Sequence, residues 1–253
     1  MMVLRSNLLT HSGFAHGFTT REGGVSEAPF ESADFALLRN ASALQENQAR
    51  LATAVGFDAA RLYQAEQVHG ADVFEPTREP VSLGTFKLVN ARYPKADALV
   101  AREPGDTVGV RVADCVPVLV GDKRTGYVAA IHAGWKGVVA EVVKRAIEVL
   151  GAAAAEDLVA AIGPCIGACC FEVSREVAEK IGVASTQSCI VSTHEPAKAM
   201  VDLRRAVAAQ LARLQVKEVE QVGGCTKCEG EKYYSFRRDG DNAGRLIGVI
   251  TAR

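Results

Sequence analysis

The spacing of apolar residues along the chain predicts four helices. From residue 41 to residue 55 the apolar positions recur every three or four residues, and Gly56 follows as a stop signal. The clearest periodicity of this kind runs from residue 138 to residue 150. Asp202 is a typical N-cap residue in front of a third helix, and a fourth helix is expected to start near Ser174.

Short β-rich runs alternate with these helices, at residues 107–112, 116–121, 127–131, 158–162, 189–191 and 246–251. A polar turn at residues 122–126 joins the second run to the third, and it is too short for a crossover helix, so the two runs are expected to form an antiparallel hairpin. Other runs are separated by the predicted helices. The pattern therefore predicts a mixed α/β (α+β) fold, with helices packed on mixed β-sheets, and disfavours a purely parallel doubly wound sheet.

Length and composition narrow the class of protein. The 253 residues fit a single domain over residues 1–253, in which the linker-like stretch at residues 75–95 is expected to be a loop. The 29 Lys+Arg residues nearly balance the 30 Asp+Glu residues, which gives no bulk attraction to nucleic acid or to an anionic membrane. No apolar run is long enough to span a membrane and no signal-peptide pattern is present, so we expect a cytoplasmic monomer or small homo-oligomer.

The seven cysteines are the main source of candidate chemistry. In a reducing cytoplasm an odd number of cysteines predicts buried residues, metal ligands or nucleophiles, and not a disulfide framework. Cys115 lies immediately before one strand of the predicted hairpin and His132 immediately after the other, so the hairpin is expected to bring the two side chains together. With His69, at the end of another β-like run, they form a usual ligand set for zinc that leaves a fourth position open for catalysis.

The same residues also fit a second kind of site. Cys115 would then be a thiolate nucleophile, with His132 as the base and Asp114 as the orienting group. The two interpretations compete, because a thiolate committed to a metal is poorly available for attack. For each residue, ordinary packing is the alternative, since no ligand-spacing motif joins them.

Two other segments contain closely spaced cysteines. Residues 163–172 follow an apolar run and could form an anion-binding turn, but the phosphate-loop spacing is incomplete and a structural turn is favoured. Cys225 and Cys228 have the spacing of a metal or redox pair. A single pair of this kind without a second one favours an incidental pair of thiols in a surface loop.

Two arginines are candidate anion ligands. Arg21 and Arg237 each lie in a short polar cluster and each offers a guanidinium fork for phosphate or carboxylate. Solvated surface arginines are the alternative that sequence alone leaves open.

Seven short blocks occur in the order seen in the YfiH-type family, at residues 20–26, 67–70, 96–100, 112–117, 132–137, 163–167 and 235–239. The chain resembles this family from about Phe18 to its last residue. The family has been labelled polyphenol oxidase (laccase) and, later, purine nucleoside phosphorylase. No single block is specific to the family, but seven blocks in the same order are.

The resemblance implies a fold, a metal and an activity. The fold is a YfiH-like mixed α/β domain, and the metal is zinc held by His69, Cys115 and His132. The activity is phosphorolysis of adenosine, inosine and methylthioadenosine to the free base and a sugar 1-phosphate, with adenosine deamination as a second reaction. The expected partners are therefore a purine nucleoside and phosphate.

Further residues acquire expected roles from their places in the matching blocks. Arg21, Gln67 and Arg237 are expected to bind substrate or phosphate. Asp114 and Cys115 are expected to be catalytic, with Asp114 either orienting a histidine ligand or transferring a proton.

Two other activities stay open at this stage. A multicopper oxidase of the usual kind needs a blue-copper site and a three-copper cluster, and five histidines are too few for both. A Cys/His site can nevertheless take up copper, which leaves a copper-dependent polyphenol oxidase as one alternative. The other is a Cys115-dependent cytoplasmic amidase that edits peptidoglycan precursors, a role also attached to bacterial relatives. A non-catalytic metal-binding protein would be a different class again.

Overall fold

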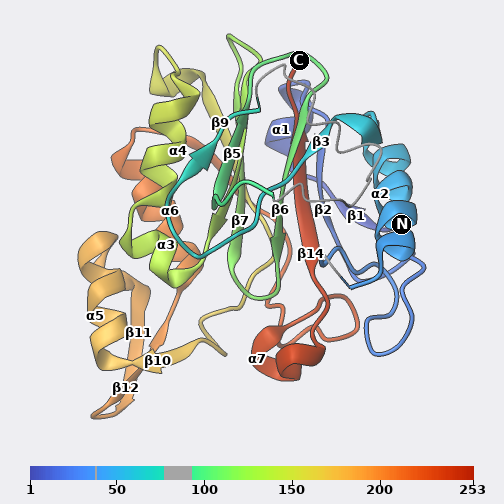
Figure 1. The fold of residues 1–253 in the computed structure, drawn as a ribbon. Helices are drawn as coiled ribbons and strands as arrows, with labels where there is room; N and C mark the ends of the chain where they lie inside the picture. Colours follow the sequence, from blue (N-terminus) through green and yellow to red (C-terminus); the bar gives the residue numbers. More distant parts are fainter. Residues whose placement is uncertain (38, 77–92) are drawn as a thin grey trace.

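Four layers of secondary structure are stacked in the computed structural model, which describes residues 1–37, 39–76 and 93–253 (Figure 1). A layer of helices covers one face of a six-stranded sheet, a five-stranded sheet covers the other face, and one long helix lies on the outside of the five-stranded sheet. The helices are α1 (Asn7–His11), α2 (Ala41–Val55), α3 (Trp135–Val139), α4 (Val142–Leu150), α5 (Arg175–Ala184), α6 (Leu203–Arg213) and α7 (Phe236–Asp239).

The strands of the described residues form three sheets. The six-stranded sheet has the order β13 (Glu218–Gln221), β9 (Leu158–Ile162), β7 (Val116–Asp122), β8 (Val128–Ala133), β5 (Ala98–Ala101), β4 (Val73–Phe74). The five-stranded sheet has the order β1 (Val3–Leu4), β2 (His16–Thr19), β14 (Leu246–Thr251), β6 (Thr107–Val112), β3 (Leu62–Tyr63). A small sheet has the order β10 (Glu172–Ser174), β12 (Lys198–Val201), β11 (Ile190–Glu195).

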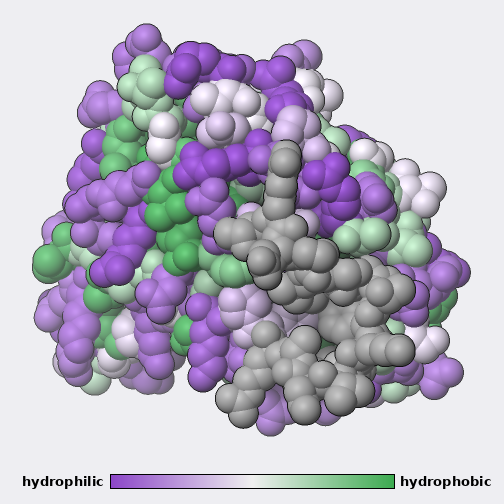
Figure 2. Space-filling view, turned by 45° about the horizontal axis from the view of Figure 1, so that its top comes forward, coloured by the Kyte–Doolittle hydropathy of each residue, from purple (hydrophilic) through white to green (hydrophobic). Residues whose placement is uncertain are grey.

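The central strands are apolar on both faces because both faces are covered. Val118 of β7 packs with Val142 of α4 on the helix side. The next residue, Leu119, points to the opposite face and packs with Val108 and Ile250 of the five-stranded sheet. Charged and polar residues predominate on the outer surface seen in Figure 2, where apolar residues form a narrow band and scattered spots. An apolar cluster therefore fills the space between the two sheets.

The mixed α/β fold predicted from the sequence is confirmed. Strands β7 and β8 form the expected antiparallel hairpin, whereas β13 and β9 are parallel. The predicted helix at residues 41–55 is α2, and Asp202 caps α6 by accepting a hydrogen bond from the backbone N–H of Arg205. No helix among the described residues combines the length and apolar character needed to cross a membrane.

The structure differs from the sequence prediction in one helix. The run expected to be one helix at residues 138–150 is divided into α3 and α4, and Glu141 between them has a left-handed backbone with φ +58°. Val138 and Val142 are both fully buried in one apolar cluster, so their spacing alone resembles that of a continuous helix. The strand expected at residues 189–191 begins one residue later, with β11. The loop expected at residues 75–95 falls mostly outside the described residues.

Candidate active site

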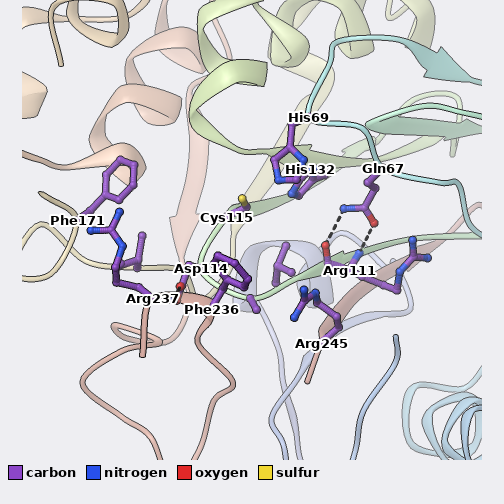
Figure 3. Close-up of a pocket in the computed structure, with 13 residues that line it drawn as sticks. Gln67, His69, Arg111, Asp114, Cys115, His132, Phe171, Phe236, Arg237 and Arg245 are labelled. Carbon is purple, nitrogen blue, oxygen red and sulfur yellow. Dashed lines mark hydrogen bonds between the residues drawn. The ribbon is translucent and has the colours of Figure 1, made fainter. Parts of the chain in front are cut away.

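The β7–β8 hairpin places Cys115 beside His132. Its register pairs Val116 with Ala133 and Pro117 with His132, and Cys115 directly precedes β7. His69 joins them from the segment after β3, with its ring centroid 4.9 Å from that of His132 at an interplanar angle of 77°. The potential ligand atoms of His69, Cys115 and His132 all lie within 4.8 Å of one another. The structure thus brings together the three residues that the sequence suggested (Figure 3).

Asp97, directly before β5, holds both histidines in place. Its Oδ1 is 2.8 Å from Nδ1 of His132 and accepts a hydrogen bond from the backbone N–H of His69 at 2.9 Å. Its Oδ2 accepts hydrogen bonds from the backbone N–H groups of Val68 and Gly70, at 3.2 and 2.6 Å. A carboxylate on Nδ1 fixes the orientation of a histidine and leaves Nε2 available as a ligand.

The electrostatics of this group favour a thiolate. Burial of Cys115 opposes ionisation, but the charge of His132 and hydrogen bonds from His132 and His69 outweigh it and lower the pKa of the thiol. Burial of His132 disfavours the imidazolium, but Cys115 and Asp97 outweigh it and raise the pKa of His132. Burial of Asp97 likewise opposes its ionisation, and its hydrogen bonds with His132 and with backbone amides lower its pKa. Cys115 is therefore prepared to act as an anionic ligand or nucleophile.

The space between the three side chains fits a metal ion. A Cβ atom added to Gly134 would lie 3.0 Å from Sγ of Cys115 and 3.1 Å from Cδ2 of His69. Glycine at this position therefore keeps the space between the ligands free. One thiolate and two imidazole nitrogens suit zinc with a fourth position open to the cavity, and the same set also accepts copper.

These side chains lie in the wall of a cavity of about 390 Å³, a volume typical of small-molecule sites. The residues that line it are Gln67, His69, Arg111, Val112, Ala113, Asp114, Cys115, His132, Ile166, Phe171, Phe236, Arg237 and Arg245. The wall thus combines a potential metal site, two aromatic rings and three arginines.

Two of these arginines offer positive charge to a ligand. A terminal nitrogen of Arg237 donates to the carbonyl of Glu172 at 2.9 Å, and one of Arg245 donates to the carbonyl of Ala243 at 2.7 Å. Among the described residues, neither guanidinium is within ion-pair distance of a carboxylate. In Figure 3 they lie on either side of Phe236. Guanidinium groups that have no carboxylate partner in a cavity wall are typical of sites for phosphate or carboxylate.

Asp114 supplies the only carboxylate among the residues that line the cavity. Its backbone is left-handed, with φ +90°, and its carboxylate accepts hydrogen bonds from the hydroxyl of Thr226 and the backbone N–H of Arg237, both at 2.6 Å. Asp97, and not Asp114, is the carboxylate that contacts His132. The sequence had left that orienting role open for Asp114, and the structure fills it with a different residue.

The two other predicted substrate ligands differ in position. Arg21 is not among the lining residues, and its guanidinium donates to the backbone carbonyls of Glu31 and Gly230 at 2.9 and 3.0 Å. Gln67 does line the cavity, but its amide is engaged at both ends by the backbone of Arg111, at 2.7 and 2.8 Å (Figure 3). Gln67 therefore fixes the end of β6, and Arg21 connects the loops that contain Glu31 and Gly230.

A comparison with known protein families identifies the family of this chain. The sequence model of the family described as "Multi-copper polyphenol oxidoreductase laccase" matches residues 15–253. The chain belongs to this family. The YfiH resemblance of the seven sequence blocks is thereby confirmed.

Curated members of the polyphenol oxidoreductase laccase family cover nearly the whole chain. "Purine nucleoside phosphorylase SCO2081" of Streptomyces coelicolor is 35% identical over 250 residues, covering 95% of this chain and 96% of that protein. "Purine nucleoside phosphorylase YfiH" of Escherichia coli is 32% identical over 240 residues, covering 94% and 93%. The mouse "Purine nucleoside phosphorylase LACC1" is 31% identical, and the match spans only 57% of its length. These names support an enzyme.

A solved structure of the same family confirms the fold. The crystal structure of YfiH from Bacillus licheniformis superposes with a TM-score of 0.85 at 28% identity, covering 95% of this chain and 93% of that one.

Asp97 and Arg245 are important to the site and were not identified from the sequence. Asp97 lies in one of the family blocks, directly before β5, whose first residue pairs with the neighbour of His132, and its place in that block was the available signal. Arg245 has no such signal, because it comes from the segment before β14 and reaches the cavity only through the pairing of β14 with β6.

Proposed function

We propose that this chain is a zinc-dependent purine nucleoside phosphorylase acting on adenosine, inosine and methylthioadenosine, with adenosine deaminase activity. The observation that carries the proposal is the convergence of His69, Cys115 and His132 on a cavity that also presents unpaired arginines. A phosphorolytic enzyme must hold an inorganic anion next to an uncharged nucleoside, and this cavity offers both cationic and aromatic walls.

In phosphorolysis an oxygen of phosphate attacks the anomeric carbon, the glycosidic C–N bond breaks, and its electron pair leaves with the purine. Arg237 and Arg245 bind the phosphate and hold it against the sugar, which removes the entropic cost of bringing two reactants together. Phe171 and Phe236 provide apolar faces for the purine ring and exclude water around it.

The remaining groups of the site also have roles in phosphorolysis and deamination. A zinc ion held by His69, Cys115 and His132 would supply Lewis acidity for the leaving purine and for an attacking water in deamination. Asp97 keeps the imidazole of His132 oriented and anchors the backbone of His69. Asp114 holds or delivers a proton at a carboxylate oxygen, since it is the only acid among the residues lining the cavity.

Product analysis tests the proposal. Purified protein is incubated with adenosine and phosphate, and the products are separated by chromatography. Adenine with ribose 1-phosphate is the expected result, together with inosine and ammonia from deamination and hypoxanthine from phosphorolysis of that inosine. Inosine alone would restrict the activity to deamination, and no turnover in the presence of zinc would refute the proposal.

Removal and replacement of the metal should show whether zinc or copper supports the activity. Dialysis against a chelator is expected to abolish both phosphorolysis and deamination, because the open coordination position is lost with the ion. Zinc in excess over the metal sites should restore both reactions to the apo protein. Recovery with copper but not zinc, together with oxidation of a phenolic substrate, would instead support the polyphenol oxidase. Against that alternative, no cluster of potential ligands in the described part of the chain contains more than two histidines.

The two arginines selected from the sequence should behave differently. Arg237→Ala is expected to raise the KM for phosphate by about 10- to 100-fold, since a hydrogen bond to a charged group contributes about 1.5–3 kcal/mol. Arg21→Ala is expected to leave this KM unchanged and to lower the Tm, because Arg21 joins backbone carbonyls outside the cavity. Initial rates at saturating inosine and varied phosphate measure the difference, and equal effects in both variants would contradict it.

A second function is favoured by one specific observation. The thiol of Cys115, the imidazole of His132 and the carboxylate of Asp97 form a continuous chain of contacts, which is also the arrangement of a cysteine hydrolase. An amidase that edits peptidoglycan precursors would use Cys115 as its nucleophile. Such an enzyme would release amine from a precursor peptide after chelation, whereas the proposed phosphorylase would be inactive in its apo form.

A further inference from the structure

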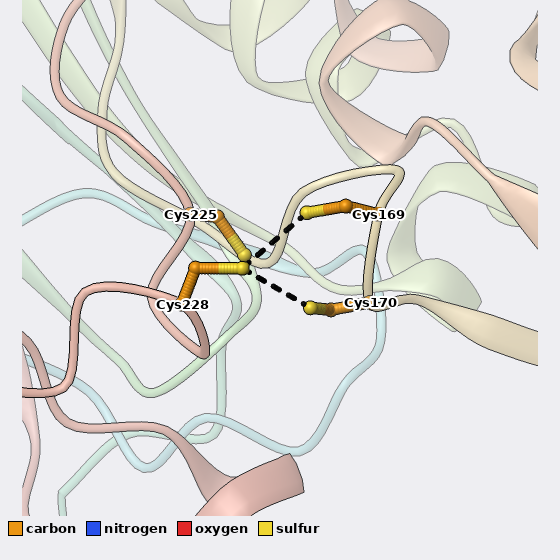
Figure 4. A group of neighbouring side chains, drawn as sticks. All are labelled: Cys169, Cys170, Cys225 and Cys228. Carbon is orange, nitrogen blue, oxygen red and sulfur yellow. Dashed lines mark hydrogen bonds between the residues drawn. The ribbon is translucent and has the colours of Figure 1, made fainter.

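Four cysteines outside the proposed active site are brought together from two distant segments. Cys169 and Cys170 belong to the loop between β9 and β10, and Cys225 and Cys228 belong to the loop between β13 and α7 (Figure 4). The four Sγ atoms all lie within 4.8 Å of one another. Sγ of Cys228 is 3.6 Å from that of Cys169 and 3.4 Å from that of Cys170.

These separations are close to those of thiolates around one tetrahedral ion. With a Zn–S distance of about 2.3 Å, the edge of an S₄ tetrahedron is about 3.8 Å. We propose that Cys169, Cys170, Cys225 and Cys228 form a second zinc site, structural in function and separate from the site at Cys115. All four positions are filled by protein ligands, which is the usual arrangement of structural zinc.

The backbone around the cluster is shaped to hold thiolates. The N–H of Gly167 donates to Sγ of Cys225 at 3.2 Å. A Cβ atom at Gly167 would lie 3.2 Å from Sγ of Cys169 and 3.3 Å from Sγ of Cys225, so glycine lets the loop close over the sulfurs. Arg238 donates to the carbonyls of Thr226 and Lys227, at 3.0 and 3.2 Å, while its guanidinium also pairs with Asp239 at 2.7 Å. These bonds fix the turn that places Cys225 and Cys228 side by side.

A disulfide explains this geometry less well. A disulfide joins two sulfurs at about 2.05 Å and would leave the other two unused. Sγ of Cys228 is nearly equidistant from Cys169 and Cys170, so it is not committed to one partner. The incidental thiol pair favoured for Cys225 and Cys228 by their sequence is therefore replaced by a four-cysteine cluster, whose other half lies more than fifty residues earlier.

The proposed ion would fasten two segments that support the cavity. In the first loop, the backbone N–H of Ile166 donates to the carbonyl of Asp114 at 2.9 Å. In the second loop, Thr226 donates to the carboxylate of the same residue at 2.6 Å. The two loops also pair with each other, through the backbone N–H of Thr226 and the carbonyl of Cys165 at 3.0 Å. Zinc at the cluster thus stabilises the loop that carries Ile166 and Phe171 into the cavity wall and the loop that leads into α7, the helix of Arg237.

Metal stoichiometry tests the inference independently of activity. Elemental analysis of the full chain is expected to give two zinc ions in the wild type and one in Cys228→Ala or Cys170→Ala. Cys115→Ala should also retain one, and Cys115→Ala/Cys228→Ala none. The control Cys189→Ala removes a buried cysteine outside both clusters and should retain two. Unchanged zinc in the Cys228 and Cys170 variants would overturn the inference, whatever happens at Cys115.

Two measurements on folded protein cover the case in which a cluster variant fails to fold. Cobalt-substituted Cys115→Ala should show strong thiolate-to-metal charge-transfer absorption and the visible bands of a tetrahedral ion. In the same variant, a mercurial thiol reagent should release one equivalent of zinc to a colorimetric chelator. Absence of these bands, or a mass showing disulfides among the four cysteines in protein without metal, would refute the site. Iron in place of zinc would also contradict it.

Discussion

Replacement of Cys115 by alanine is expected to lower kcat/KM for the phosphorolysis of inosine by about 10³-fold. The thiolate is the anionic member of the proposed ligand set, and Lewis-acid catalysis supplies several kcal/mol, of which about 4 kcal/mol corresponds to 10³-fold in rate. Initial rates and elemental analysis of the same preparation measure the two losses together. One equivalent of zinc should disappear with the activity.

A control variant and two alternative outcomes determine how this experiment is interpreted. Cys189→Ala removes another cysteine, one that lies outside the cavity lining, and should retain both metal and turnover. A Cys115→Ala variant that keeps all its zinc but loses turnover would move Cys115 from ligand to nucleophile. A variant that keeps its turnover would contradict both interpretations of the residue.

Asp97→Asn is expected to weaken zinc binding and to lower kcat/KM by about 10- to 100-fold, the range found when a carboxylate that supports a metal-bound histidine is removed. The amide has nearly the shape of the carboxylate, but it replaces one acceptor oxygen with an N–H₂ group. That group would face backbone N–H donors, since Asp97 accepts from three of them as well as contacting His132. The expected fall in the free energy of unfolding is about 2 kcal/mol.

Asp106→Asn is the matched control for this variant. Asp106 is also a buried aspartate, and its partner is the guanidinium of Arg61 at 2.7 Å. Its replacement should lower stability by a similar amount and leave the zinc dissociation constant unchanged. If both variants bind zinc equally well, Asp97 has only a structural role.

The sequence was informative wherever contacts are local or follow from one turn. A five-residue turn is enough to predict the β7–β8 hairpin, and the hairpin is enough to predict that Cys115 and His132 meet. The N-cap at Asp202 could also be predicted, because its side chain accepts a hydrogen bond from a backbone N–H only three residues ahead. Periodicity failed at Glu141, since a single left-handed residue can divide a helix without changing the spacing of the buried valines.

The sequence was least informative where sheets bring distant segments together. Arg245 reaches the cavity because β14 pairs with β6, more than one hundred residues away in the chain. The four-cysteine cluster depends in the same way on the bridge between Cys165 and Cys225. Such pairings arise from the packing of whole layers, and a local sequence pattern does not indicate which distant segments become neighbours. Arg21 illustrates the converse, because a charged residue in a matching block is bound to backbone carbonyls outside the site.

The left-handed backbone of Asp114 has a consequence for engineering. A residue other than glycine at φ +90° costs about 1–3 kcal/mol, and glycine would remove most of that cost. Glycine would, however, also remove the carboxylate that joins Thr226 to the backbone of Arg237. Loss of the acceptor for these two donors costs about 1–3 kcal/mol each, which offsets the relief of backbone strain. Selection for heat tolerance alone should therefore keep aspartate at position 114, because its side chain stabilises the backbone conformation that its own Cβ strains.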